Sequence, residues 1–162
     1  MRLLALIGLC LAATMLTACG GGDSSEESSA TVGRVEKAPV PDSAKPPKVQ
    51  LPPGPSPRRL IVRDLKEGTG APIPPHLGVR VHTNFVALGY RTGKPTEIRW
   101  RPTGAFNIGL EPGKEIEGWE KGLVGMKAGG RRELLIPGRM AYGNEAIYYL
   151  IDLLSIEWPP FG

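Results

Sequence analysis

From residue 60 onward, the sequence predicts an α+β fold in which an antiparallel sheet is laid over a single helix. Short apolar segments recur between turn signals such as "YRTGKP", a pattern typical of β-strands. One segment, ahead of a double glycine, instead places its apolar residues at helical spacing. Several strands with a single helix imply an antiparallel sheet that packs on that helix.

The expected strands are short, and the clearest of them alternates apolar with polar residues. In 79–88, Val81 and Phe85 lie on one face, and Arg80 and His82 lie on the other, which predicts one buried face. The expected strands cover residues 60–65, 79–88, 96–100, 105–109, 131–137 and 147–158. The helix is expected where apolar and polar residues recur at helical spacing, at Ile116, Trp119, Glu120 and Leu123.

Residues 1–18 resemble a bacterial lipoprotein signal peptide. Arg2 precedes an apolar run that ends near Thr17, and this run is short for a bilayer span, which needs roughly 20 apolar residues. The segment "LTAC" is similar to a lipobox, and this resemblance implies cleavage before Cys19 and attachment of a lipid to Cys19. An ordinary signal peptide with a chance cysteine is the alternative. Both cysteines lie in this region, so no disulfide is expected in the exported part.

Residues 19–59 are expected to form a disordered tether that begins at the lipidated cysteine. The segment "GGGDSSEESSATVG" is polar and flexible, and "KAPVPDSAKPPKVQLPPGPSP" is rich in proline and has no periodic apolar face. Such segments cannot bury enough apolar surface to offset the entropy of folding. A proline-rich docking motif at "LPPGPSP" is the alternative interpretation.

Composition restricts the class of partner. The 162 residues have a formal net charge of +4, which suits an anionic surface such as lipid headgroups or a cell-wall polymer. This excess is too small to predict nucleic-acid binding, and no interleaving of aromatic and basic residues supports it. Arg131, Arg132 and Arg139 are expected on a solvated strand face, with contact to an anionic polymer as the alternative.

The sequence predicts neither a cofactor nor a metal ion. The segment "GLEPGK" is one residue short of a phosphate-binding loop and is followed by Glu115, where such a loop needs Ser or Thr for magnesium. His76 and His82 have no cysteine partner or acidic cluster nearby in the sequence, so surface or edge positions are expected for them.

The segment "GWEKGLVGMKAGGRRELLIP", followed by "AYG" and the closing "LIDLLSIE", resembles the FKBP-type peptidyl-prolyl cis-trans isomerases. The resemblance extends from about Leu60 to Glu157. It implies a half-barrel of antiparallel strands around one short α-helix, formed by a domain at residues 60–162. It also implies an activity that needs no nucleophile, because rotation of an X–Pro amide breaks no covalent bond.

The resemblance implies roles for five residues. Trp119 corresponds to the floor on which the proline ring rests, and Ile116 to the residue whose backbone N–H receives a substrate carbonyl. Tyr142 corresponds to a tyrosine whose hydroxyl reaches the substrate. Phe85 stands where the family usually has a tyrosine, and Tyr149 stands at the usual phenylalanine of the last strand.

The sequence departs from the family pattern at three places near the expected pocket. Thr96 and Glu97 stand where the family has Phe-Asp; Glu97 is expected either to replace the aspartate or to be a solvated turn residue, and Thr96 cannot replace an aromatic wall. The spacing after Phe106 leaves open whether this ring lines the pocket or the core. After Tyr142, a tight hairpin is expected in place of the family's long loop.

Two functions are therefore expected to compete. The first is a peptidyl-prolyl isomerase acting on exported proteins, and the second is a weakly active or inactive domain that holds extended, proline-containing chains at the cell envelope. A spacer role in the envelope is a third idea, supported only by the length of the tether. The expected protein is a monomer, exported and held at a bacterial membrane by a lipid on Cys19.

Overall fold

The computed structural model describes residues 35–37, 45–76, 78–101, 106–143 and 145–159, and for 35–37 it describes the backbone alone. All of these residues belong to one compact unit, residues 31–162. The expected signal peptide and lipidation site at Cys19 lie outside the described residues. No helix among the described residues is long and apolar enough to cross a membrane.

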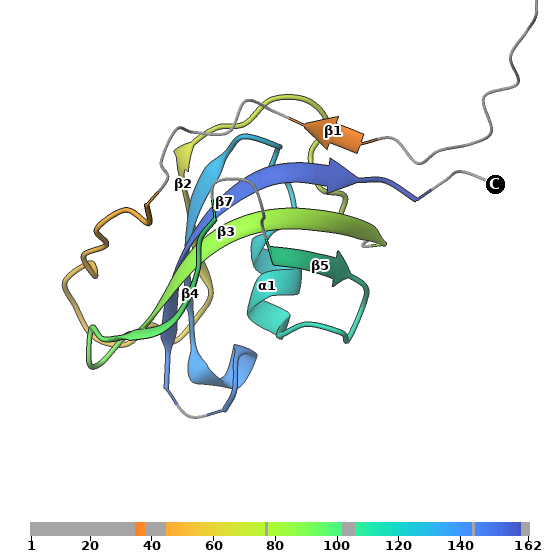
Figure 1. Cartoon of the computed structure of the whole chain (residues 1–162). Coiled ribbons are helices and arrows are strands. Elements are labelled where there is room, and N and C mark those ends of the chain that lie inside the picture. The colour runs from red at the N-terminus through yellow and green to blue at the C-terminus, as the bar shows by residue number, and fades with distance from the viewer. Residues whose placement is uncertain (1–34, 38–44, 77, 102–105, 144, 160–162) are drawn as a thin grey trace, which may run out of the picture. The chain divides into compact units, whose positions relative to one another are not determined.

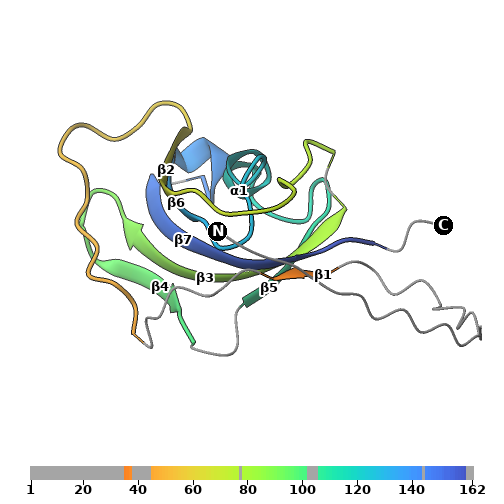
Figure 2. The ribbon, with the colours of Figure 1, turned by 90° about the horizontal axis from the view of Figure 1, so that it is seen from above.

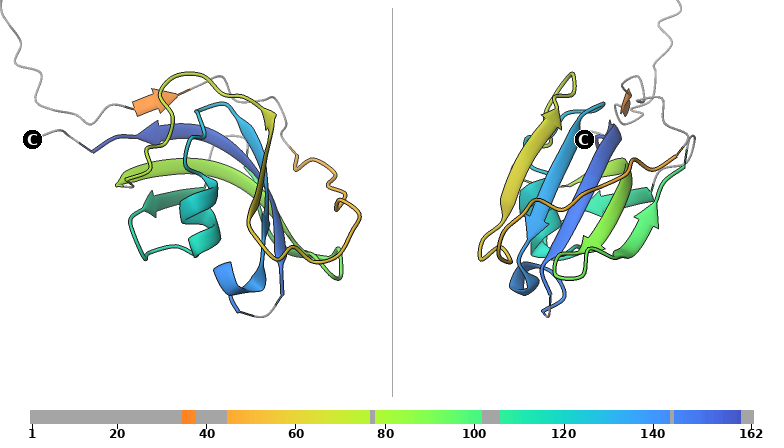
Figure 3. Two further views of the ribbon diagram at one scale, coloured as in Figure 1. Left: turned by 180° about the vertical axis from the view of Figure 1, so that it is seen from behind. Right: turned by 90° about the vertical axis from the view of Figure 1, so that its left-hand side faces the viewer.

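The described residues form an antiparallel sheet and one short α-helix, which confirms the predicted α+β class. In Figure 3 the sheet runs β2-β6-β7-β3-β4; β1 also pairs with β7, and β5 with β3. The elements are β1 (Val35–Lys37), β2 (Ile61–Lys66), β3 (Val79–Gly89), β4 (Pro95–Arg99), β5 (Phe106–Leu110), α1 (Glu117–Gly122), β6 (Arg131–Ile136), the 3-10 helix η1 (Gly138–Met140) and β7 (Ile147–Glu157). Apart from β1, each strand ends within one residue of its expected limits.

The main core lies between the sheet and α1, as the alternation in β3 predicts. Figure 1 shows the long strands β3 and β7 curving past α1. Val81 and Phe85 of β3, both buried, point to the α1 side together with Trp119 and Leu123. His82 lies on the other face, where its Nε2 is 2.6 Å from Glu157 Oε1 at the end of β7. A surface or edge position was expected for this histidine; its side chain is partly exposed, and it joins the two central strands β3 and β7.

Arg132 fixes the end of α1 against the sheet. Its guanidinium is buried, forms a two-point ion pair with Asp64 of β2, and donates to the carbonyl oxygens of Gly122 and Val124. The last carbonyls of a helix have no partner inside the helix, and a cation is favourable at this end. The expectation of a solvated strand face is therefore wrong for Arg132, whereas Arg139 is exposed.

The opposite face of the sheet carries a second apolar cluster. Its buried members are Val86, Leu88, Tyr90, Leu135, Ala146, Tyr148 and Leu150. Residues 45–59, here called the strap, run along this face, where Val49 and Leu51 pack against the cluster. Figures 2 and 3 show the strap on the side of the sheet away from α1.

For the strap, the expectation of a free tether is wrong. The two apolar residues Val49 and Leu51 are too few to show a periodic pattern, yet they cover apolar side chains that would otherwise face water. A strand within the expected tether, β1, also pairs with β7 through Val35↔Glu157. The ordered domain thus begins before residue 60.

Candidate functional site

Three buried aromatic rings meet on the α1 side of the sheet and form the aromatic floor, defined here as Phe85, Trp119 and Tyr149. The centroid of Phe85 lies 5.2 Å from that of Trp119 and 5.8 Å from that of Tyr149, and Trp119 lies 5.3 Å from Tyr149. All three contacts are edge to face, the arrangement that the charge distribution of aromatic rings favours. β3, α1 and β7 each supply one ring of the floor.

Phe106 of β5 extends the floor to the surface. Its ring meets Phe85 edge to face at 5.6 Å, and its side chain is 39% exposed. The question that the sequence left open is therefore answered: Phe106 contacts the aromatic floor and is not part of the closed core. It forms the apolar edge of the site.

Glu97 and Arg99, both on β4, lie beside the edge that Phe106 forms. Alternate residues of a strand share a face, and Arg99 pairs with Phe85 across β3 and β4, so both side chains lie on the α1 side. Arg99 Nε donates to Glu97 Oε1 at 2.7 Å, and its guanidinium lies 5.5 Å from the centroid of Phe106. A cation over an aromatic face is attracted by the ring.

Ile116 lies just before α1 and packs partly buried against the floor. Its carbonyl oxygen accepts from the N–H groups of Trp119 and Glu120, whereas its own N–H donates to no described residue. The Glu120 carboxylate accepts from the N–H groups of Gly113 and Glu115 and so holds the preceding loop to the helix. Burial raises the pKa of the Glu115 carboxyl, and the charge of Glu120 adds to this rise.

Tyr142 lies in the connection between β6 and β7, just after η1, and its side chain is 68% exposed. It interacts with the buried Tyr149. Burial raises the pKa of the Tyr149 phenol well above its ordinary value, Tyr142 and Glu97 add to the rise, and a hydrogen bond with Trp119 opposes it. The Tyr149 phenol is therefore a neutral hydrogen-bonding group at neutral pH.

The site thus combines the apolar floor with three polar features. These are the Glu97–Arg99 ion pair at its edge, the exposed hydroxyl of Tyr142 and the backbone N–H of Ile116. Among the described residues, no group of His, Cys, Asp and Glu side chains could hold a metal ion. Such a site can bind an apolar ring and orient a polar group beside it.

All six residues that the sequence singled out for the site, namely Phe85, Glu97, Ile116, Trp119, Tyr142 and Tyr149, lie on or beside the aromatic floor. Thr96 is exposed. The structure adds Arg99, which the sequence reasoning missed. The spacing of Glu97 and Arg99, two residues apart in a strand, is the signal that could have revealed their pairing.

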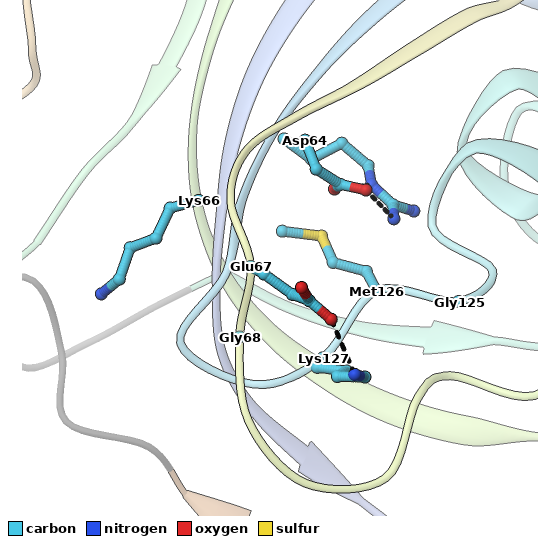
Figure 4. Close-up of a pocket in the computed structure, with 8 residues that line it drawn as sticks. Asp64, Lys66, Glu67, Gly68, Gly125, Met126 and Lys127 are labelled. Atoms are coloured by element: carbon cyan, nitrogen blue, oxygen red, sulfur yellow. Dashed lines mark hydrogen bonds and ion pairs between the residues drawn. The ribbon is translucent and has the colours of Figure 1, made fainter.

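Two hollows in the described part of the chain lie away from the floor. Figure 4 shows the smaller one, of about 100 Å³, beside Asp64 and Glu67. Asp64 is paired there with Arg132, and Glu67 with Lys127 at 2.8 Å, while Lys66 points away from both pairs. The charges of its two acidic residues are thus already matched within the chain.

Comparison with known proteins gives a consistent result. A family model described as FKBP-type peptidyl-prolyl cis-trans isomerase matches residues 71–151. An FK506-binding protein of Streptomyces anulatus is 33% identical over 125 residues, which cover 70% of this chain and 99% of that protein. A probable FK506-binding protein of Corynebacterium glutamicum is 37% identical over 121 residues, which cover 67% of this chain and 97% of that protein.

A solved structure shares the fold. The crystal structure of FkpA from Escherichia coli matches with a TM-score of 0.55 at 24% identity. The match covers 62% of this chain and 49% of that one, so the chain corresponds to about half of that protein. At this identity the likeness shows the fold alone.

Proposed function

The chain belongs to the family of FKBP-type peptidyl-prolyl cis-trans isomerases, and we propose that its aromatic floor is the place where X–Pro amides bind and rotate. The observation that carries this proposal is the meeting of Phe85, Trp119 and Tyr149, three rings from three elements, below a partly exposed edge. Aromatic side chains offer a large, rigid apolar surface for a proline ring.

Catalysis of this rotation requires only that the site bind the twisted amide more tightly than the planar amide. Rotation about an X–Pro bond is slow because it interrupts amide resonance, at a barrier of about 18–20 kcal/mol. The twisted amide has less charge separation than the planar one, so an apolar site favours it relative to water. Each tenfold gain in rate needs about 1.4 kcal/mol of such preference.

Two groups are proposed to orient the substrate. The N–H of Ile116, which donates to no other described residue, is available to a substrate carbonyl. The exposed hydroxyl of Tyr142 is available to a second polar group of the peptide. Both are proposed to act beside the floor and not as acids or bases.

A prolyl isomerisation assay on the full-length chain with Cys19→Ser tests this proposal. Trp119→Leu is expected to lower kcat/KM more than tenfold, because the ring that supports the proline is lost. Tyr142→Phe is expected to lower it by a few fold, the usual cost of one hydrogen bond. Tyr148→Phe deletes the same hydroxyl on the opposite face of the sheet and is the matched control. Equal activity of Trp119→Leu and the parent, both folded, would exclude the floor as the site.

Binding without useful turnover is the second candidate. It is favoured by Thr96, an exposed residue that cannot supply the aromatic wall expected at its position. If the folded parent does not accelerate isomerisation but does suppress aggregation of a proline-rich unfolded protein, this second function replaces the first.

We also propose that the substrates are exported proteins and that the chain is held at a membrane by a lipid on Cys19. The "LTAC" segment supports this proposal. In the bacterium, Cys19→Ser is expected to move the protein out of the membrane fraction, and mass spectrometry of the parent should find the lipid at Cys19. An unmodified Cys19 in a chain that still carries residues 1–18 would refute the proposal.

A further inference from the structure

The larger hollow lies between the strap and the sheet, on the face opposite the aromatic floor. It encloses about 570 Å³ and is bordered by residues 52–59 of the strap, by Ile61 and Arg63 of β2, and by Tyr90 and Leu135. The strap is held over it at both ends. Tyr90 donates to the carbonyl of Pro52, and Arg139 donates to the carbonyl of Arg58.

Positive charge borders the hollow on one side. Arg58, Arg59 and Arg63 line it, and no acidic residue is among its lining residues. None of the three guanidinium groups forms an ion pair with a carboxylate of the described residues. Guanidinium groups bind phosphate through two parallel hydrogen bonds, so three of them near one hollow offer the donors that an anion needs.

The rest of the lining is apolar. Ile61 and Leu135 form its base, and the strap contributes four prolines, which have no backbone N–H to donate. A small inorganic anion would leave this apolar lining in contact with water. A ligand that combines a phosphate with a short hydrocarbon portion would use both parts of the lining.

We propose that this hollow binds the phosphate headgroup of an anionic phospholipid, with the glycerol and first acyl carbons on the apolar base. An acidic peptide would use the arginines but gain little from the apolar base. The choice of a lipid also rests on the proposed anchor, because residues 19–34, which precede β1, can span on the order of 50 Å and so let this face reach the membrane. The hollow is distinct from the aromatic floor and lies on the other face of the sheet.

Nuclear magnetic resonance of the arginine Nε–H groups in the full-length chain with Cys19→Ser tests the proposal without requiring the anchor. Dihexanoyl phosphatidylglycerol, kept below its micelle-forming concentration, is expected to shift the Arg59 and Arg63 signals in a saturable way. Dihexanoyl phosphatidylcholine, which has no net charge, is expected to bind about tenfold more weakly, the usual effect of a lost charge-assisted contact. Glycerol phosphate should also bind more weakly, because it lacks the acyl carbons.

Two variants test whether the arginines of the hollow are responsible. Arg63→Gln is expected to weaken phosphatidylglycerol binding about tenfold. Arg80→Gln removes the same charge from an exposed position of β3 outside the hollow and should leave the affinity unchanged. Equal loss in both variants would show a general charge effect and overturn the proposal.

Other outcomes would also overturn it. Equal affinity for glycerol phosphate and the lipid would indicate a site for free phosphate, and tighter binding of hexaglutamate than of phosphatidylglycerol would indicate an acidic peptide. The absence of saturable shifts would show that the hollow binds none of them.

Discussion

Tyr90, in the turn just after β3, donates a hydrogen bond from its hydroxyl to the carbonyl oxygen of Pro52 in the strap, 3.2 Å away. The contact lies beside Val49 and Leu51, which pack against the second apolar cluster. The strap thus shields from water an apolar face that the strands of the sheet leave open. Its contacts should contribute to the stability of the domain.

The double substitution Val49→Ser and Leu51→Ser is expected to lower the free energy of unfolding by about 1–2 kcal/mol, because two partly buried apolar side chains are lost. Urea denaturation of the full-length chain measures this difference. Lys48→Ser, at an exposed position of the same segment, is the control. An unchanged midpoint in the double variant would mean that the strap contributes nothing to stability.

A second prediction concerns alkaline pH. Burial raises the pKa of the Tyr148 and Tyr149 phenols above the ordinary value of 10.0, and a hydrogen bond to Glu133, 2.6 Å from the Tyr148 hydroxyl, adds to the rise for Tyr148. Above pH 10 the unfolded chain loses these protons while the folded chain keeps them. The unfolded state then binds fewer protons, so the free energy of unfolding falls as the pH rises.

The fall is expected to begin near pH 10 and to become smaller in Tyr148→Phe and Tyr149→Phe, since each variant removes one of the two phenols. Urea denaturation between pH 8 and pH 11 would show it. Tyr142→Phe removes one of the contacts that raise the pKa of Tyr149, so the fall should be somewhat smaller in this variant as well. A parent whose stability does not change between pH 9 and pH 11 would contradict the prediction.

The local pattern predicted β3 well because burial on one face imposes alternation on a strand. In β3, Val79, Val81, Thr83 and Phe85 are buried on the α1 side as predicted. The same strand also buries Val86 and Leu88 on its other face. Those two residues were the signal that something covers the second face, but the covering strap has no periodic pattern of its own and could not be identified from local sequence.

The candidate site was predicted by resemblance and not by periodicity. Trp119 and Tyr149 are 30 residues apart in the sequence, and neither the strand nor the helix pattern specifies that their rings touch. The contact of Arg99 with Phe106 was missed for the same reason. β4 and β5 each pair with β3, and it is this shared pairing that brings the two side chains together. Contacts of this kind depend on the register between strands.

A third prediction concerns the two glycines of α1, Gly118 and Gly122, whose role the sequence did not reveal. Both face β6 and are buried. A Cβ atom at Gly122 would lie 2.7 Å from Cδ1 of Leu134, and one at Gly118 would lie 2.6 Å from Cδ1 of Ile136. Leu134 and Ile136 are themselves completely buried, so neither side chain can move aside easily.

Helix propensity and packing therefore make opposite predictions for Gly122→Ala. Propensity alone would stabilise the helix by about 1 kcal/mol, whereas forcing an extra methyl group into a packed core costs about 1–3 kcal/mol. Because the overlap is with a buried side chain, we expect packing to dominate and the free energy of unfolding to fall. The same reasoning applies to Gly118→Ala.

A double-mutant cycle separates the two effects. Leu134→Ala leaves a cavity and should destabilise the chain by about 2–5 kcal/mol. In combination with Gly122→Ala, part of that space is filled, so the double variant should be more stable than the sum of the single effects predicts. Lys121→Ala, at an exposed position of α1, should change the free energy of unfolding by less than about 0.5 kcal/mol. If Gly122→Ala stabilised the chain, α1 would have to be able to move away from β6. Close packing of the helix on the sheet would then not explain the glycine at this position.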